Sequence, residues 1–416
     1  MKTKYLILLA VAITTLSCNK TENHNYPNNI QPTNITISIS DALNNLDNAI
    51  TDLNITTKGG NCPTYQRKSV FCVGNNCFNK TKSMDVNIPD TLLYAVNFDN
   101  NEGFAVLSAN RHLSDDIYCI TEKGCITLEH FQSAFDFLHT PNHTTRSSMN
   151  EDSFYDMGKT FVPALILSSM LADLKYGKIV DNSSTKTTIA TTNKVLLRTK
   201  WGQGAPFNMY LNGCVTGCVS TACAQVMEYC KVPPHPIFDG VSCSWQDMAL
   251  VQNVDNLNDD NYPESATRQV GHFFREIGKK ENCNIKYGKE SSSGSASGAV
   301  RTLKNFGYYG VKKHLGFKTK NQNRVSDMLS HGWPVYIDAL DFHHGGGHAW
   351  VIDGEWNGYF HCNWGWDGAW DGYYAKHNYF PVDYREYIDS TDPDTSFSTN
   401  RDYDWDFSII TYSTPY

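Results

Sequence analysis

Apolar side chains recur at helical spacing in three segments of this chain. In residues 37–53 the apolar positions advance in alternating steps of four and three, and residues 128–138 also favour a helix. The third segment begins at Cys218 and ends before Pro233, because proline cannot continue a helix. Gly217 permits a tight entry, so we expect Cys218 in the first turn of this helix. Unpaired N–H groups and the helix dipole favour an anion there, which predicts a thiol of lowered pKa.

Short apolar runs bounded by turns predict strands in the N-terminal half. Residues 92–98 and 104–108 flank a turn at residues 99–103, which indicates a hairpin. Residues 117–120 predict a third strand, followed by the helix at 128–138. This half is therefore expected to form a small α+β domain.

Two further strands are predicted downstream of Cys218. A glycine run leads through His348 into an apolar strand that stops at Asp353, and a second strand is expected over residues 359–366, which contain Asn363. His348 and Asn363 lie 130 and 145 residues after Cys218. An imidazole can deprotonate a thiol and a carboxamide can orient the imidazole, so this order favours a papain-like Cys-His-Asn arrangement.

Each of these residues has competitors. Cys223 falls on the inner face of the predicted helix and favours packing, whereas Cys214 precedes the helix. His343 and His344 compete with His348, and the three histidines could bind a metal. No ligand pair at helical i, i+4 spacing supports such a site, so we expect no metal. Asn363 could merely end a strand, and Trp364 and Trp366 could be ordinary core residues.

Three blocks resemble streptopain-type cysteine peptidases, the C10 family: GCVSTACAQVMEY at residues 217–229, GGHAWVIDG at 346–354 and HCNWGW at 361–366. WGQGAPFN at residues 201–208 resembles the segment that supplies the oxyanion-hole glutamine of that family, here Gln203. Shorter similar segments are SSSGSA at 291–296, NFGY at 305–308 and WPVY at 333–336. The resemblance runs from about residue 193 to the C-terminus.

The resemblance implies a papain-like α+β catalytic domain and a cysteine endopeptidase that needs no cofactor. Cys218, His348, Asn363 and Gln203 are the implied catalytic residues. Ser295, Gly347 and Trp364 are the implied substrate contacts, and the family favours an apolar residue second before the scissile bond. Protein or peptide substrates are the expected partners.

The N-terminal half also resembles part of that family. YAVNF at residues 94–98 and GFAVLSANR at 103–111 resemble its inhibitory propeptide, although a generic accessory domain stays an alternative. Residues 181–194 are polar, rich in Ser and Thr, and aperiodic, which is typical of an exposed linker open to proteolysis. We therefore expect a propeptide over residues 19–190, acting as the chain's own inhibitor, and a peptidase domain over 191–416.

The first 18 residues predict export. A basic start at residues 1–4 precedes an apolar stretch at 5–13 that is too short to span a bilayer. The following TLSC resembles a bacterial lipoprotein cleavage site, with Cys18 as the lipidated residue and a possible lipid anchor; an ordinary signal peptide is the alternative. The expected location is the outer membrane, the cell surface or the medium of a bacterium.

Composition agrees with an exported enzyme. The formal net charge is −8 and there is no long basic run, so nucleic acid is not an expected partner. Thirteen cysteines in an oxidising compartment make disulfides plausible, Cys62, Cys72 and Cys77 among them, but their connectivity does not follow from sequence. Three other functions stay open: a catalytically silent lipoprotein that binds peptide or host protein, a Cys-His acyltransferase or amidase on the same scaffold, and, more remotely, a metallohydrolase.

Overall fold

The structure is a computed structural model, and it describes residues 35–56, 65–78, 86–139, 153–176, 194–251, 263–341, 346–376 and 405–415. The chain divides into two units, Met1–Asn34 and Ile35–Tyr416, and all described residues belong to the second. The predicted signal segment and Cys18 therefore lie outside the described residues.

The described helices are α1 (Ile39–Thr56), α2 (Leu128–His139), α3 (Ser153–Tyr176), α4 (Cys218–Cys230), α5 (Trp245–Leu250), α6 (Glu264–Gly278), α7 (Ala296–Asn305) and α8 (Thr319–Ser330). The strands are β1 (Arg67–Val73), β2 (Leu93–Phe98), β3 (Phe104–Ser108), β4 (Ile117–Thr121), β5 (Ile237–Phe238), β6 (Val241–Ser242), β7 (Tyr309–Leu315), β8 (Val335–Asp341), β9 (Gly346–Trp356), β10 (Tyr359–Asn363), β11 (Gly372–Ala375) and β12 (Trp405–Ser413). Two short 3₁₀ turns cover Asn75–Cys77 and Asp99–Asn101. This mixed architecture confirms the predicted α+β class.

One antiparallel sheet runs through both halves of the chain. Its strand order is β1-β2-β3-β4-β11-β10-β9-β8-β12-β7. The junction is the pair β4 and β11, in which Thr121 lies opposite Gly372 and Cys119 lies opposite Tyr374. The N-terminal half therefore continues the sheet of the C-terminal half by backbone hydrogen bonds. The boundary at residue 190 stays a prediction, because that stretch lies outside the described residues.

The N-terminal half contains more elements than its patterning predicts. The hairpin β2–β3, strand β4 and helices α1 and α2 occur where we expected them, whereas β1 and α3 were not predicted. Helix α3 is buried throughout residues 161–172, packed with α2 and with residues of the sheet in the main core. A segment covered on every side has no apolar stripe of helical period, so the search for amphipathic periodicity did not detect this helix.

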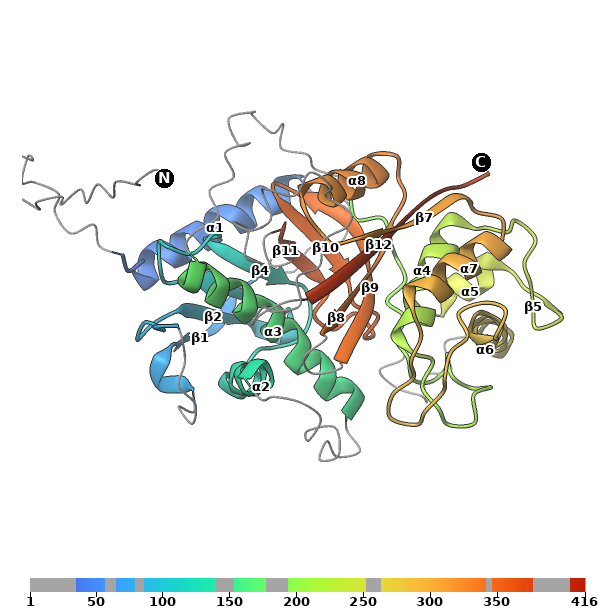
Figure 1. Cartoon of the computed structure of the whole chain (residues 1–416), viewed down its shortest axis with the longest axis horizontal. Helices are drawn as coiled ribbons and strands as arrows, with labels where there is room; N and C mark the ends of the chain where they lie inside the picture. Colours follow the sequence, from blue (N-terminus) through green and yellow to red (C-terminus); the bar gives the residue numbers. More distant parts are fainter. Residues whose placement is uncertain are drawn as a thin grey trace, which may run out of the picture. The chain divides into compact units, whose positions relative to one another are not determined.

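Helix α4 forms the centre of the C-terminal half. It packs against β9, α6 and α7, and Figure 1 shows α4 to α7 gathered beside the strands of this half. Its residues from Val219 to Glu228 are all buried. Strand β9 is longer than predicted, because it continues through Gly354 to Trp356 while pairing with β10.

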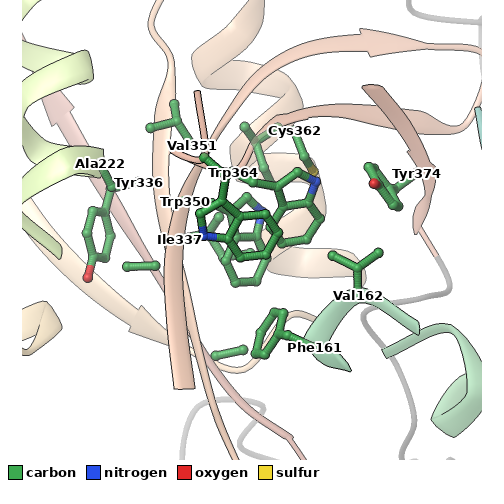
Figure 2. Packing of buried hydrophobic residues seen from close by; sticks show 14 of the residues in the cluster. Phe161, Val162, Ala222, Tyr336, Ile337, Trp350, Val351, Cys362, Trp364 and Tyr374 are labelled. Carbon is green, nitrogen blue, oxygen red and sulfur yellow. The ribbon is translucent and has the colours of Figure 1, made fainter. Parts of the chain in front are cut away.

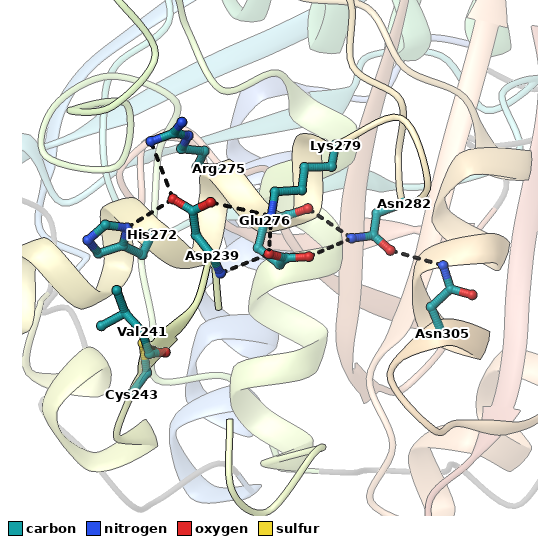
Figure 3. Close-up of polar contacts among 9 residues, drawn as sticks. All are labelled: Asp239, Val241, Cys243, His272, Arg275, Glu276, Lys279, Asn282 and Asn305. Atoms are coloured by element: carbon teal, nitrogen blue, oxygen red, sulfur yellow. Dashed lines mark hydrogen bonds and ion pairs between the residues drawn. The ribbon is translucent and has the colours of Figure 1, made fainter. Parts of the chain in front are cut away.

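A network of charged and amide side chains fixes the short hairpin β5–β6 to α6 (Figure 3). The carboxylate of Asp239, in the hairpin turn, forms ion pairs of 3.3 Å with Arg275 and Lys279 and lies 3.3 Å from Nδ1 of His272. Its main-chain N–H donates to Glu276 at 2.8 Å. Because these groups are largely near the surface, the network contributes modest stability and defines the geometry of the turn.

Candidate active site

Cys218 is the first residue of α4, as predicted. Gly217 precedes it with φ of 86°, in the left-handed region, and a side chain there would approach Ser292 to 3.1 Å. The main-chain N–H groups of Ala349, Val219 and Cys218 itself all point at the thiol. The sulfur thus lies against the residue that follows His348 in β9.

The prediction of a lowered thiol pKa is wrong for this form of the chain. Burial, together with the nearby carboxylate of Asp338, raises the pKa of Cys218 to about 11. The three N–H groups act in the opposite direction but do not outweigh burial. The thiol is therefore protonated at neutral pH.

His348 is buried in β9 and surrounded by aromatic rings. Its Nε2 lies 2.8 Å from the main-chain oxygen of Trp364, and its ring stacks on Trp366 with centroids 4.4 Å apart. A carbonyl oxygen can only accept, so Nε2 carries the proton and Nδ1 presents a lone pair. Burial lowers the pKa of His348 to about 4, against the opposing effect of the Trp364 carbonyl, so the imidazole is neutral.

Asn363 does not bind His348 directly, contrary to the papain-like prediction. Its Oδ1 accepts from Gln225 Nε2 at 2.8 Å and from the Gly365 N–H at 3.2 Å, while its Nδ2 donates to the Thr199 oxygen at 2.9 Å. The Gly365 N–H and the Trp364 carbonyl belong to one peptide unit. Asn363 therefore reaches the imidazole through a backbone amide instead of its own side chain.

Gln203 lies beside the start of α4. Its main-chain oxygen accepts from Thr216 N–H at 3.0 Å, and its side chain is 1% exposed. Among the described residues, Nε2 of Gln203 has no hydrogen-bond partner. A buried amide donor without a partner is costly, which fits a group reserved for a bound oxygen atom.

Phe161 of α3 packs edge-on against the His348 ring, with centroids 5.6 Å apart. Phe161 also contacts Trp350 and Trp364 (Figure 2). Figure 2 places Phe161 and Ala222 of α4 on opposite sides of the strands that carry Trp350. Within the described part of the chain no hydrogen bond joins the Cys218 thiol to His348, and the thiol instead lies against the backbone of Ala349.

The proposed substrate contacts differ in accessibility. Ser295 is exposed, but its hydroxyl caps α7 by accepting from Gly298 N–H at 3.2 Å. Gly347 is half-buried at the start of β9. Trp364 is 1% exposed, so its indole cannot meet a substrate in this form. The sequence interpretation missed the role of the Trp364 backbone, whose carbonyl oxygen binds His348.

The competing residues are placed elsewhere. Cys223 is buried, with its sulfur 3.9 Å from that of Cys283, and Cys214 lies in the loop before α4. Cys72 and Cys77 are free thiols, while Cys62 lies outside the described residues. His343 and His344 also lie outside them, and no cluster of three potential metal ligands occurs among the residues that are described. In the same part of the chain no helix is long and apolar enough to cross a membrane.

Patterning also missed Gln225, which links the site together. Its Oε1 accepts from the Thr199 hydroxyl at 3.2 Å and from Trp201 N–H at 3.3 Å, while its amide binds Asn363. It therefore connects α4, the segment leading to Gln203 and the end of β10. The signal available in the sequence was its position two helical turns after Cys218.

An α+β fold with a cysteine opening a central helix and a histidine on the adjacent strand defines the class of papain-like thiol hydrolases. Residues 201–374 match the model of the Peptidase C10 family. This part of the chain is therefore similar to the catalytic region of that family.

Individual proteins are similar to parts of this chain. Streptopain of Streptococcus pyogenes serotype M28 is 26% identical over 240 residues, covering 45% of this chain and 58% of that protein. The thiol protease/hemagglutinin PrtT of Porphyromonas gingivalis is 28% identical over 199 residues, covering 40% and 21%. The matched region thus spans less than two thirds of either relative. A prointerpain A fragment of Prevotella intermedia shares the fold, with a TM-score of 0.50 and 21% identity over 79% of this chain and 98% of that fragment.

Proposed function

We propose that the chain is the precursor of an exported cysteine endopeptidase, held inactive by its N-terminal half. The observation that carries this proposal is the Cys218 thiol at the start of α4, packed against the strand residue next to His348. The match of residues 201–374 to the Peptidase C10 family model and the shared fold of a proprotein fragment support it.

The reaction follows from the chemistry of these groups. Nδ1 of His348 takes the thiol proton as the Cys218 sulfur attacks the peptide carbonyl carbon. The imidazolium then protonates the departing amine, leaving a thioester on Cys218. Water, deprotonated by His348, attacks this thioester and releases the acid and the free thiol. The Trp364 carbonyl holds the imidazole in the tautomer this cycle needs, with Nδ1 unprotonated.

Gln203 would stabilise the oxyanion together with the Cys218 N–H. We expect Gln203→Ala to lower kcat by about 10²- to 10³-fold with little change in KM, because this donor acts on charge that develops in the transition state. Gln203→Glu, nearly equal in size but unable to donate, should be at least as damaging. Initial-rate kinetics on a peptide substrate measure both.

The matched control is Gln322→Ala on α8, which loses one hydrogen bond to the Lys376 oxygen away from the site. A Gln203→Ala enzyme with the kcat of the wild type would show that this glutamine only packs.

Latency has two physical supports. The resting pair is neutral, because burial raises the pKa of the Cys218 thiol and lowers that of His348. Phe161, from the N-terminal half, covers one edge of the imidazole. Removing this half would expose the pair to solvent and substrate, and the helix-start N–H groups could then lower the thiol pKa.

A buried charge cluster attaches the N-terminal half. Glu122, just after β4, lies 3.3 Å from Nε2 of His361 and 3.7 Å from Lys200. On its other side His361 binds Asp353 at 2.6 Å. Burial alone would lower the pKa of His361, but the two carboxylates raise it to about 10, so the ring is cationic. Removing Glu122 would leave this buried cation with one partner.

We therefore expect Glu122→Gln to accelerate maturation of the full-length chain. Because Glu122 is partly exposed, the loss should be modest, and conversion should quicken by about tenfold, the factor that corresponds to about 1.4 kcal/mol. The readout is a gel time course, in which a species of about 220–230 residues should appear. N-terminal sequencing should place its first residue between positions 183 and 198. Glu129→Gln, at an exposed site on α2, is the matched control and should mature at the wild-type rate.

Two further outcomes test the precursor proposal. The Cys218→Ala chain should persist at full length if processing is autocatalytic, and the fragment of residues 19–181 should inhibit the mature enzyme when added separately. A folded fragment that neither binds nor inhibits would contradict the assignment of the N-terminal half as an inhibitor.

Substrate class and location rest on the family resemblance. We propose protein substrates with an apolar residue second before the scissile bond, contacted near Ser295 and Gly347, and export with a lipid anchor on Cys18. The direct test is to incubate the chain of residues 19–416 with casein, a reducing agent and either a thiol alkylator or a chelator. Hydrolysis stopped by the alkylator alone supports the proposal, and hydrolysis stopped by the chelator contradicts it.

A further inference from the structure

The buried carboxylate of Asp371 binds the main chain of Trp364, the residue whose carbonyl binds His348. Asp371, just before β11, is 1% exposed, and its Oδ1 accepts from the Trp364 N–H at 2.9 Å. The carbonyl of the same Trp364 accepts from His348 Nε2–H at 2.8 Å. Asp371 is therefore connected to the imidazole by two successive hydrogen bonds through a single residue.

The backbone around Trp364 depends on these contacts. Gly365 has φ of 72°, in the left-handed region, and a side chain there would approach Thr221 to 3.0 Å. Its N–H is held by Asn363 Oδ1. Asp371 thus binds the N–H of Trp364, and Asn363 binds the N–H of Gly365. Together they fix the direction of the Trp364 carbonyl, which lies between these two N–H groups.

A carboxylate is a costly choice for a purely structural acceptor at this depth. Burial raises the pKa of Asp371 to about 7, and the nearby cations Lys200 and His361 partly oppose that effect. An asparagine could accept the same N–H at lower desolvation cost. On the other side, the Asp371 main-chain oxygen accepts from Glu122 N–H at 2.8 Å, so the residue also borders the N-terminal half.

We propose that Asp371 is a positioning residue for the peptidase reaction, fixing the Trp364 backbone so that its carbonyl holds His348 with Nδ1 free to act as the base. The proposal rests on the function proposed above. It assigns Asp371 no contact with substrate; its effect passes entirely through Trp364.

The kinetic test compares Asp371→Leu and Asp371→Asn in the full-length chain after maturation. The leucine variant should lose about 100-fold in kcat with KM within about twofold, because the base is misplaced while substrate binding is not. The asparagine variant should stay within about threefold of the wild type, since its Oδ1 can still accept from Trp364. Asp353→Asn is the matched control, a buried carboxylate of the same charged region that accepts from Leu197 N–H at 3.1 Å.

Asp353→Asn should alter thermal stability more than kcat. If Asp371→Leu keeps its kcat within about threefold, or if Asp353→Asn lowers kcat as much as Asp371→Leu does, the positioning role is overturned. An Asp371→Asn enzyme as impaired as the leucine variant would also overturn it, because the acceptor would then be irrelevant.

A second readout does not need activity. In the full-length Cys218→Ala chain labelled with ¹⁵N-histidine, the His348 imidazole N–H should exchange slowly, assigned by its absence from the His348→Ala/Cys218→Ala chain. Asp371→Leu should speed this exchange by about tenfold or more, and Asp371→Asn should not. Unchanged exchange in the leucine variant overturns the proposal. A wild-type chain that matures but hydrolyses no peptide would instead contradict the proposed function, and the exchange result would still decide the role of Asp371.

Discussion

Replacing Cys218 with alanine is expected to abolish proteolysis, with a fall in kcat on the order of 10⁶-fold, the scale observed when a nucleophile is removed from a catalytic triad. Without the sulfur no thioester can form, and the remaining oxyanion donors accelerate only direct attack by water. The measurement is the rate of casein or peptide hydrolysis by the reduced enzyme, with circular dichroism to establish that the variant folds.

The chain supplies its own controls for this result. Cys214→Ala, in the loop before α4, should retain activity, and a chelator should leave the wild-type rate unchanged. Full activity in the Cys218→Ala variant would disprove the thiol mechanism. Loss of activity on adding a chelator would instead indicate a metal site formed by the histidines around His348.

The position of Cys218 could be predicted because three local signals agree. Gly217 is required for the left-handed backbone, the apolar positions after Cys218 have helical period, and Pro233 limits the length. The strands that carry His348 and Asn363 could be predicted equally well, since each is short, apolar and bounded by a turn. Local sequence rules are sufficient to predict a helix or strand whose own residues determine its structure.

The chemistry between these elements was less predictable. The residue that binds the His348 Nε2–H is a main-chain carbonyl, and any residue at position 364 would supply one, so its identity carries no signal. The prediction assigned this bond to Asn363, whose side chain instead binds Gln225 and Gly365 N–H. The raised pKa of Cys218 depends on burial by elements far away in sequence, which a local helix argument omits.

Long-range packing explains the remaining differences. Helix α3 was not predicted because its residues 161–172 are buried and have no amphipathic period. The junction of β4 with β11 was not predicted because it joins residues about 250 positions apart. A sheet shared by both halves places Glu122 beside His361 and Asp371. The release of the N-terminal half proposed above would therefore have to break backbone hydrogen bonds as well as the charge cluster.

Replacing His348 with alanine is expected to be nearly as damaging as loss of the thiol, because the base and the nucleophile act as one unit. Asn363→Ala should behave differently. It leaves the Gln225 amide, the Gly365 N–H and the Thr199 carbonyl without their partner, so we expect a loss of about 1–3 kcal/mol of stability for each group that stays buried and unpaired.

Turnover in the Asn363→Ala enzyme should nevertheless remain measurable, because the Trp364 carbonyl still reaches the imidazole. Steady-state kinetics and thermal unfolding, measured on the same preparations, separate the two effects. His344→Ala is the control for the choice of base and should retain the wild-type rate. If that variant is inactive while His348→Ala is active, the base has been assigned to the wrong histidine. If Asn363→Ala is as inactive as His348→Ala yet fully stable, the carboxamide must contact the imidazole directly during turnover, and the backbone route through Trp364 is not the one the reaction uses.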